Sequence, residues 1–362
     1  MSFRYSLGIV VSVAGSSSEK SSKIAILGAG SWGSTLAKVF AAAGKDVALW
    51  TRDEKKADEI NQTRRVEKPL RVEFPATIFV TADLEKCLDN REIIILACTS
   101  QSVRSLAQLV KAHLSSNKPV VAGRSSQPEQ KEILVNVAKG LELESFLRMS
   151  QILEEFFPAE SICSLSGPNL AFEILHGLPT ASVIACKDDK VAKHIQSQLT
   201  IPTLRMYSNT DITGVELGGA FKNVIAIAAG ALDELNLGTN AKAALLTRGL
   251  AEMTRIAVTM GAKASTMSGL AGLGDLMATC SSDLSRNYRL GKMIAHGVTV
   301  DSALGTLGAV AEGVNTANAV CHLGEKMNVE LPIALQVETA LKGEISPQKA
   351  IMNLMNRPLI SE

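Results

Sequence analysis

The most unusual reactive side chain in the sequence is Lys222. It lies in residues 212–232, a stretch that carries only two charges, Glu216 and Lys222. A helix that is apolar nearly all round is buried, and burial lowers the pKa of a lysine toward neutrality, where the amine can both donate and accept a proton. Lys222 is therefore a candidate general acid and base. The alternative is a lysine that reaches solvent at the helix end or pairs with Glu216.

A second signature is a set of glycines spaced G-x-G-x-x-G, namely Gly28, Gly30 and Gly33. They follow the apolar run Lys23–Leu27 and precede an alanine-rich helical stretch at 34–43. In a strand–turn–helix, these glycines allow a tight turn, close approach of the backbone to a pyrophosphate, and close packing of the helix on the strand. Free N–H groups at the helix start hold the pyrophosphate. The spacing therefore predicts a dinucleotide-binding site.

The residues after the second predicted strand bear on which dinucleotide binds. NAD-specific sites usually place Asp or Glu at that strand end, where it binds the ribose 2′-hydroxyl. Here Asp46–Trp50 is followed by Thr51 and Arg52, and Asp53 comes only afterwards. A cation at this point would bind the extra phosphate of NADP. We therefore expect NADPH to be favoured, with NAD still accepted because of Asp53.

Polar and charged groups that could belong to a ligand site recur further along the chain. They are Lys139, the loop 166–169 (Ser-Gly-Pro-Asn), Asp275 after a glycine-rich turn, the run Ser285, Arg286 and Asn287, and Glu312. An arginine beside a hydroxyl and an amide suits a phosphate or a carboxylate. Lys139 and the 166–169 loop each follow a predicted strand, and ligands bind beyond the carboxyl ends of parallel strands. None of these groups is specific by itself.

The elements that must position these residues change type along the chain. Alternating strand-like and helical runs predict a doubly wound, mainly parallel α/β sheet in the N-terminal half. Further strands are predicted at 93–97, 119–122, 133–137, 161–165, 181–185 and 203–206, with helices at 103–113 and 149–156. From about Asn209 the periodicity is helical, which predicts an all-α region. We expect a flexible extension at 1–21, a dinucleotide-binding Rossmann domain at 22–208 and a helical substrate and catalytic domain at 209–362.

Composition argues against several kinds of partner. The chain has 37 Lys+Arg against 36 Asp+Glu and only 4% aromatic residues. It therefore lacks the net positive charge that would attract nucleic acid or an anionic membrane, and it has few aromatic side chains on which bases could stack. The longest plainly apolar run, 224–232, is too short to span a bilayer. No H-x-x-x-H or C-x-x-C spacing occurs, which predicts no metal site and free thiols in a reducing compartment.

The first 22 residues stand apart from the rest of the chain. They hold eight serines, and Arg4 precedes a short apolar stretch. We expect a flexible extension on a cytoplasmic protein, although this composition leaves import into an organelle open.

Taken together, the motifs resemble those of bacterial-type NAD(P)-dependent glycerol-3-phosphate dehydrogenases. The resemblance runs from about Ser22 to about Asn356 and rests on the order of segments 28–33, 138–142, 166–169, 218–226, 272–275, 285–287 and 311–314. It implies an N-terminal Rossmann domain, a C-terminal helical domain and a homodimer. The implied reaction is the reversible reduction of dihydroxyacetone phosphate to sn-glycerol 3-phosphate for glycerophospholipid synthesis.

The resemblance also implies a role for each motif. Lys222 would donate and accept the proton, and Asp275 would support it. The substrate would be bound by Lys139, Gly167, Asn169, Lys222, Asp275, Ser285, Arg286 and Asn287. The dinucleotide would contact Gly28, Gly30, Ser31, Trp32, Gly33, Arg52, Lys139, Ala171, Arg286, Val310 and Glu312.

Two departures from the family pattern and two rival classes remain. Residues 98–100 (Cys-Thr-Ser) stand where the family usually has a proline, and 123–131 looks like an insertion ahead of Lys139. Another lysine-dependent hydroxyacid dehydrogenase would space its lysine and asparagine as K-x-x-x-N, whereas Lys222 and Asn223 are adjacent. A non-catalytic NADP-binding regulatory protein would be expected to have lost Lys222 or Asp275.

Overall fold

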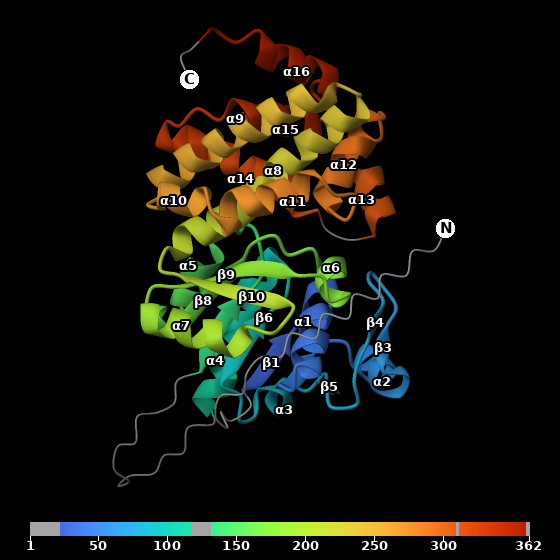
Figure 1. Ribbon diagram of the computed structural model, residues 1–362, viewed down its shortest axis with the longest axis vertical. Helices are drawn as coiled ribbons and strands as arrows, with labels where there is room; N and C mark the ends of the chain where they lie inside the picture. The colour runs from blue at the N-terminus through green and yellow to red at the C-terminus, as the bar shows by residue number, and fades with distance from the viewer. Residues whose placement is uncertain (1–21, 117–131, 309–310, 360–362) are drawn as a thin grey trace.

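The computed structural model describes residues 22–116, 132–308 and 311–359, which form a sheet part and a helical part (Figure 1). In the view of Figure 1 the helices α8 to α16 lie above the sheet and its flanking helices. The expected extension at 1–21, the expected strand at 119–122, the insertion at 123–131 and Val310 lie outside the described residues.

The main sheet has eight strands in the order β10-β9-β8-β7-β6-β1-β2-β5. Their bounds are β1 (Lys23–Leu27), β2 (Asp46–Trp50), β5 (Phe79–Thr81), β6 (Ile93–Leu96), β7 (Ile133–Asn136), β8 (Ile162–Ser166), β9 (Thr180–Cys186) and β10 (Leu204–Asn209). Six neighbouring strands of this sheet, β5, β2, β1, β6, β7 and β8, are all parallel. Taken in chain order, they follow the 3-2-1-4-5-6 arrangement of dinucleotide-binding sheets. The predicted doubly wound, mainly parallel sheet is confirmed. A small hairpin, β3 (Arg65–Val66) and β4 (Val72–Glu73), lies outside it.

Helices cover both faces of this sheet. They are α1 (Ser31–Ala42), α2 (Glu54–Thr63), α3 (Leu84–Leu88), η1 (Ser100–Ser102), α4 (Val103–Ser116), α5 (Met149–Glu154), η2 (Ala159–Ser161), α6 (Ala171–Leu175) and α7 (Asp189–Leu199). Alternate residues of β1 enter different cores: Ile26 joins the cluster that contains Phe40 of α1, and Leu27 joins the cluster that contains Val110 of α4. Because both faces are buried, the strands are continuous apolar runs in the sequence.

The last two strands reverse direction. β9 runs antiparallel to β8, with Cys163 opposite Cys186, and β10 is parallel to β9. The sequence predicted both strands but within a parallel pattern. A parallel return usually needs a crossover helix that runs along the sheet. Here the connection holds only the five-residue α6, after which Gly177, at φ +73°, helps turn the chain back.

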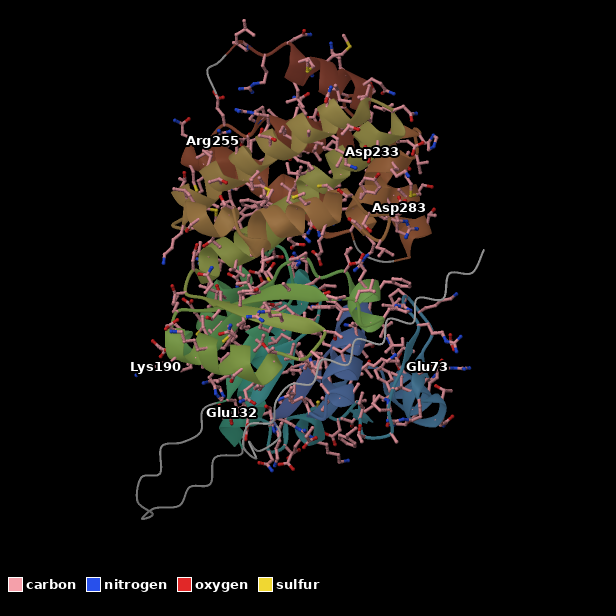
Figure 2. All side chains as sticks on the ribbon, in the orientation of Figure 1. Glu73, Glu132, Lys190, Asp233, Arg255 and Asp283 are labelled. Atoms are coloured by element: carbon pink, nitrogen blue, oxygen red, sulfur yellow. The ribbon has the colours of Figure 1, made fainter. Side chains whose placement is uncertain are left out.

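The C-terminal region is helical, as predicted. It comprises α8 (Ile212–Glu234), α9 (Gly238–Thr259), α10 (Ala264–Met267), the π-helical turn η3 (Leu270–Gly274), α11 (Asp275–Cys280), α12 (Arg286–Ala295), α13 (Val300–Leu307), α14 (Glu312–Met327), α15 (Pro332–Leu341) and α16 (Pro347–Met355). In Figure 2 the labelled Asp233 and Arg255 lie on α8 and α9, Asp283 lies in the loop between α11 and α12, and Glu73 and Lys190 lie at the outline of the sheet part.

The central element of this region is α8. Asp211 caps it by accepting a hydrogen bond from the backbone N–H of Gly214 at 2.9 Å. Its length and apolar composition would suit a membrane span, yet 94% of its most apolar stretch is buried inside the protein, as in a core helix. It crosses α12 closely, because a Cβ on Gly230 would lie 1.9 Å from the Tyr288 carbonyl oxygen. The predicted buried helix is confirmed.

Candidate active site

The glycine-rich turn between β1 and α1 has the shape its sequence predicts. Gly28 has φ +128° and its N–H donates to the Trp50 carbonyl at 2.9 Å. A Cβ on Gly33 would lie 1.9 Å from the Gly28 carbonyl oxygen, so the helix packs directly on the turn. A Cβ on Gly30 would meet no protein atom within 4 Å. The turn is therefore open at Gly30, the position where a pyrophosphate approaches the backbone.

The first turn of α1 is ready to bind an anion. Gly30 provides no side-chain cap, and no acidic residue occurs in the first turn. The backbone N–H groups at this helix start are not bonded by a capping side chain, which suits a pyrophosphate. Ser31 and Trp32 begin the helix and are half-buried. The residues present thus fit the dinucleotide that the spacing predicts.

The carboxyl end of β2 carries the residues expected to distinguish NAD from NADP. Arg52 is exposed, whereas the Asp53 carboxylate accepts a hydrogen bond from the Lys56 backbone N–H at 3.2 Å and so caps α2. The Lys56 ammonium donates to the Ala29 carbonyl at 2.8 Å. Sequence reasoning missed Lys56, because nothing in the linear pattern pairs it with the glycine-rich turn 27 residues earlier.

Lys222 lies in a buried cluster of charges. Its side chain is 8% exposed, and its ammonium donates to the Asp275 carboxylate and, at 2.8 Å, to the Thr279 hydroxyl. Lys139 donates to the other oxygen of Asp275 at 2.6 Å and to the Gly167 carbonyl at 3.0 Å. The structure thus gathers Lys139, Gly167, Lys222 and Asp275, whose sequence positions span 137 residues. Thr279, which sequence reasoning missed, lies one turn after Asp275 on α11.

Burial determines the protonation of Lys222. Loss of solvent lowers its pKa from 10.5 to about 7; the Asp275 carboxylate opposes this shift, and the neighbouring Lys139 charge reinforces it. Pairing with Glu216, the alternative considered from sequence, is wrong. Glu216 instead accepts a hydrogen bond from Arg148 at 2.7 Å.

Two buried polar atoms beside this cluster have no protein partner within the described residues. They are the Ser166 hydroxyl oxygen and the Asn169 side-chain oxygen. A Cβ on Gly219, one turn before Lys222, would lie 2.5 Å from the Ser166 hydroxyl. Asn169 uses its amide nitrogen to bond the Ser182 hydroxyl at 3.0 Å. Leaving such atoms unbonded costs free energy, which is a feature of sites that a polar ligand completes.

The N-terminal ends of α12 and α14 lie next to each other. Ser285 caps α12 by accepting from the Tyr288 backbone N–H at 3.2 Å, and the exposed Arg286 is the first residue of this helix. The Asn287 side-chain oxygen accepts from the Gly313 backbone N–H at 3.0 Å. Ser285 and Asn287 therefore shape this corner, and the α12 N-terminus with Arg286 offers donors to an anion.

The departure at residues 98–100 connects the two parts of the molecule. The Ser100 hydroxyl, in η1 after β6, donates to the Glu312 carboxylate at 2.8 Å. Burial raises the pKa of Glu312, and the hydrogen bond from Ser100 opposes that shift. This hydrogen bond places Glu312, the first residue of α14 and a candidate cofactor-binding residue, against the edge of the sheet where the parallel strands end. Ala171, the first residue of α6, is half-buried.

A dinucleotide-binding sheet joined to a helical region with a buried lysine–aspartate pair defines a class, the two-part nicotinamide-dependent dehydrogenases. Family models for the N-terminus and the C-terminus of NAD-dependent glycerol-3-phosphate dehydrogenase match residues 23–192 and 211–352. The chain belongs to the NAD(P)-dependent glycerol-3-phosphate dehydrogenase family. It is therefore an oxidoreductase that uses NAD or NADP, as the motifs predicted.

Individual relatives agree over nearly the whole chain. The glycerol-3-phosphate dehydrogenase [NAD(P)+] of Corynebacterium jeikeium is 43% identical over 92% of this chain and 98% of its own length. The protein of the same name from Anaeromyxobacter dehalogenans is 40% identical over 92% and 97%. The crystal structure of glycerol-3-phosphate dehydrogenase from Coxiella burnetii has a TM-score of 0.83 and 34% identity, and the match covers 93% of this chain and 99% of that one.

Proposed function

We propose that the protein reduces dihydroxyacetone phosphate to sn-glycerol 3-phosphate, reversibly, with Lys222 as the general acid and base. The observation that carries this proposal is the Lys222–Asp275–Lys139 cluster. It places an amine whose pKa is about 7 in a buried site next to the dinucleotide sheet. An acid with that pKa can give up and regain a proton near neutral pH. The relatives are named for the same reaction.

The hydrogen bonds of Lys222 indicate how the proton is transferred to the substrate. In the reducing direction its ammonium donates a proton to the substrate oxygen as negative charge develops there, while Asp275 and Thr279 hold the amine in place. Lys139, bound to the same carboxylate, supplies a second positive charge for the alkoxide. The nicotinamide, when bound, supplies the hydride.

Substrate orientation comes from the opposite corner of the site. The phosphate would be held by Arg286 and the N-terminal N–H groups of α12, which Ser285 and Asn287 position. On the other side, Asn169 and Gly167 would face the glycerol hydroxyls, where the unpartnered oxygen of Asn169 lies. Fixing both ends of the substrate aligns its ketone for transfer.

The dinucleotide would lie along the open turn at Gly30, with Ser31 and Trp32 against it. Arg52 supports a preference for NADPH, because it is exposed at the end of β2 while Asp53 caps α2. Ala171, Arg286, Val310 and Glu312 complete the proposed contacts to the dinucleotide.

The test of the reaction is an assay at 340 nm of purified protein with dihydroxyacetone phosphate, run separately with NADPH and NADH. We expect rapid oxidation, faster at low cofactor concentration with NADPH. Folded protein that binds NADPH and oxidises it with no detectable rate would refute the substrate and favour the non-catalytic class. Equal kcat/KM for NADPH and NADH would refute the preference alone.

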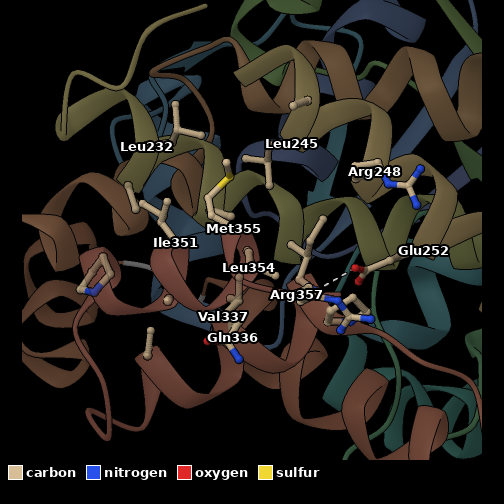
Figure 3. A pocket seen from close by; sticks show the side chains of 18 of the residues that line it. Leu232, Leu245, Arg248, Glu252, Gln336, Val337, Ile351, Leu354, Met355 and Arg357 are labelled. Carbon is tan, nitrogen blue, oxygen red and sulfur yellow. Dashed lines mark hydrogen bonds between the residues drawn. The ribbon is translucent and has the colours of Figure 1, made fainter. Parts of the chain in front are cut away.

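We also propose that the protein is a homodimer and that its interface is an apolar groove in the helical region. The groove has a volume of about 780 Å³ and is lined by α8, α9, α15 and α16 (Figure 3). Leu245, Ile351 and Leu354 line it, and Met355 beside them is 80% exposed. Uncovered apolar surface of this kind is typical of a surface that another chain covers.

Sedimentation of the full chain tests the interface. The wild type should have twice the 38.4 kDa mass of one chain, and Leu245→Glu should yield monomers. Leu109→Glu is the matched control, because Leu109 is 53% exposed on α4, away from the groove. A monomeric wild type refutes the dimer, and a dimer that survives Leu245→Glu refutes this interface.

The proposed function also includes a metabolic role and a location in the cell. We propose a cytoplasmic enzyme that supplies the glycerol phosphate backbone of phospholipids, the role that the family resemblance implies; the relatives themselves are named only for the dehydrogenase reaction. Depletion of the protein should lower cellular sn-glycerol 3-phosphate, and a normal level after depletion would exclude this role. Cell fractionation should recover the protein with cytosolic markers, and recovery with an organelle would exclude the location.

A further inference from the structure

We propose that Lys56 is a second phosphate-binding cation of the dinucleotide site and, with Arg52, sets its preference for NADP over NAD. This inference rests on the proposed preference for NADPH, and it concerns a side chain that the sequence motifs leave without a role. It starts from the contact of Lys56 with the glycine-rich turn.

Lys56 spans two elements that border the adenosine end of a dinucleotide site. It lies in the first turn of α2, four residues after Arg52, and its ammonium donates to the Ala29 carbonyl at 2.8 Å. Ala29 stands between the first two glycines of the turn. In sheets of this type the adenosine ribose lies between that turn and the end of the second strand. The Lys56 ammonium is therefore at the place where the ribose 2′ position faces the protein.

The ammonium keeps binding capacity there. A lysine has three N–H donors, and the bond to Ala29 uses one of them. Lys56 is half-buried, so its chain is held by packing while part of the side chain stays open to solvent. The fixed geometry reduces the conformational entropy that a lysine would otherwise lose on binding a phosphate.

The charges around this point favour a phosphate over a hydroxyl. Arg52 and Lys56 are positive, and Asp53 is the negative group between them in sequence. Asp53 is the residue that could bind a ribose hydroxyl, but one of its oxygens accepts the Lys56 backbone N–H. Two cations and a carboxylate committed to its own helix suit the 2′-phosphate of NADP.

The test is calorimetry with two fragments that differ only in that phosphate, adenosine 2′,5′-bisphosphate and adenosine 5′-monophosphate. Lys56→Met keeps most of the aliphatic length and removes the charge. We expect this variant to lower the affinity for the bisphosphate about tenfold and the affinity for the monophosphate less than twofold. Lys55→Met is the matched control, because Lys55 is an exposed lysine on the same turn of α2; it should change both affinities less than twofold.

The outcomes separate the two possible roles of Lys56. Equal weakening of both fragments would show that Lys56 only holds the glycine-rich turn, and no weakening of either would show that it takes no part; both overturn the proposal. If Lys55→Met weakened bisphosphate binding as much as Lys56→Met does, any nearby positive charge would suffice, and the proposal would be overturned as well. Because neither fragment reacts, failure of the dihydroxyacetone phosphate assay leaves this readout intact, and the two proposals fail separately.

Discussion

Two buried ion pairs lie six residues apart on α8 and behave differently. At its N-terminal end, the Glu216 carboxylate accepts hydrogen bonds from Arg148 at 2.7 Å, from the Ser150 backbone N–H and hydroxyl at 2.8 and 2.6 Å, and from the Ser164 hydroxyl at 2.8 Å. One negative charge meets one positive charge, and four donors satisfy it. This pair joins α8 to α5 and β8, so it fastens the helical region to the sheet.

At Lys222 the charges do not balance. One buried carboxylate, Asp275, faces the ammonium groups of both Lys222 and Lys139. Burial and the second ammonium lower the pKa of Lys222 to about 7. A fully satisfied pair holds a structure together, whereas a surplus of positive charge in a buried place produces an amine that can exchange its proton. Both pairs are buried, so burial alone does not separate them; the difference is that Glu216 faces one cation, whereas Asp275 is shared by two.

The largest effect expected from this contrast follows Lys222→Met. Loss of the general acid should lower turnover about 10³-fold to 10⁴-fold, while NADPH affinity stays nearly unchanged. The free energy of unfolding should not fall, because Asp275 keeps Lys139 as its partner. Steady-state kinetics, a cofactor titration and urea unfolding measure the three quantities. Wild-type turnover in this variant would end the catalytic assignment.

Glu216→Leu should have the opposite profile. It strands Arg148 in a buried place, which should lower the free energy of unfolding by about 3 kcal/mol, while the folded fraction keeps turnover within about twofold. Arg148→Met combined with Glu216→Leu should recover most of the stability, because no buried charge is then unpaired. A loss of turnover as large as that of Lys222→Met in folded protein would contradict the anchoring role.

The pH dependence of the reaction should reverse with its direction. Reduction needs a protonated Lys222, so its turnover should fall as pH rises above about 7, by about 50-fold from pH 7 to pH 9. Oxidation needs the neutral amine and should rise over the same range and level off. Initial rates in both directions, at saturating substrate, test the sign. Parallel profiles in the two directions would show that another group titrates.

A smaller effect should come from Thr279→Val, which keeps the shape and removes one acceptor. The hydroxyl accepts from the Lys222 ammonium at 2.8 Å and so favours the protonated amine. Its loss should lower turnover in reduction about tenfold at pH 7 and shift the falling limb to lower pH. Ser164→Ala is the matched control on the anchoring side, and it should leave the pH profile unmoved. An unshifted limb in Thr279→Val would leave the hydroxyl with a structural role only.

Much of the framework could be predicted from local sequence. β1 and β2 have the predicted bounds, and the glycines between β1 and α1 take the predicted turn, because steric requirements at Gly28 and Gly33 are local. The apolar character of α8 predicted its burial, since a helix without a polar face has no side to turn to water. The sequence could also have excluded pairing of Glu216 with Lys222. Residues six apart are about 240° apart around a helix and point different ways.

The partners of the buried charges were decided only by the tertiary structure. The local sequence around Lys222 does not indicate Asp275 or Thr279, more than 50 residues later: the family resemblance implied Asp275, but nothing implied Thr279 or the contact of Lys56 with Ala29. The reversal of β9 is of the same kind, because alternation of side chains is equal for parallel and antiparallel neighbours. Local sequence determined which residues are buried and which turns are tight, because those depend on steric fit and on water. Which charges meet, and so what the pKa of Lys222 is, depends on distances between separate elements that only the packed fold sets.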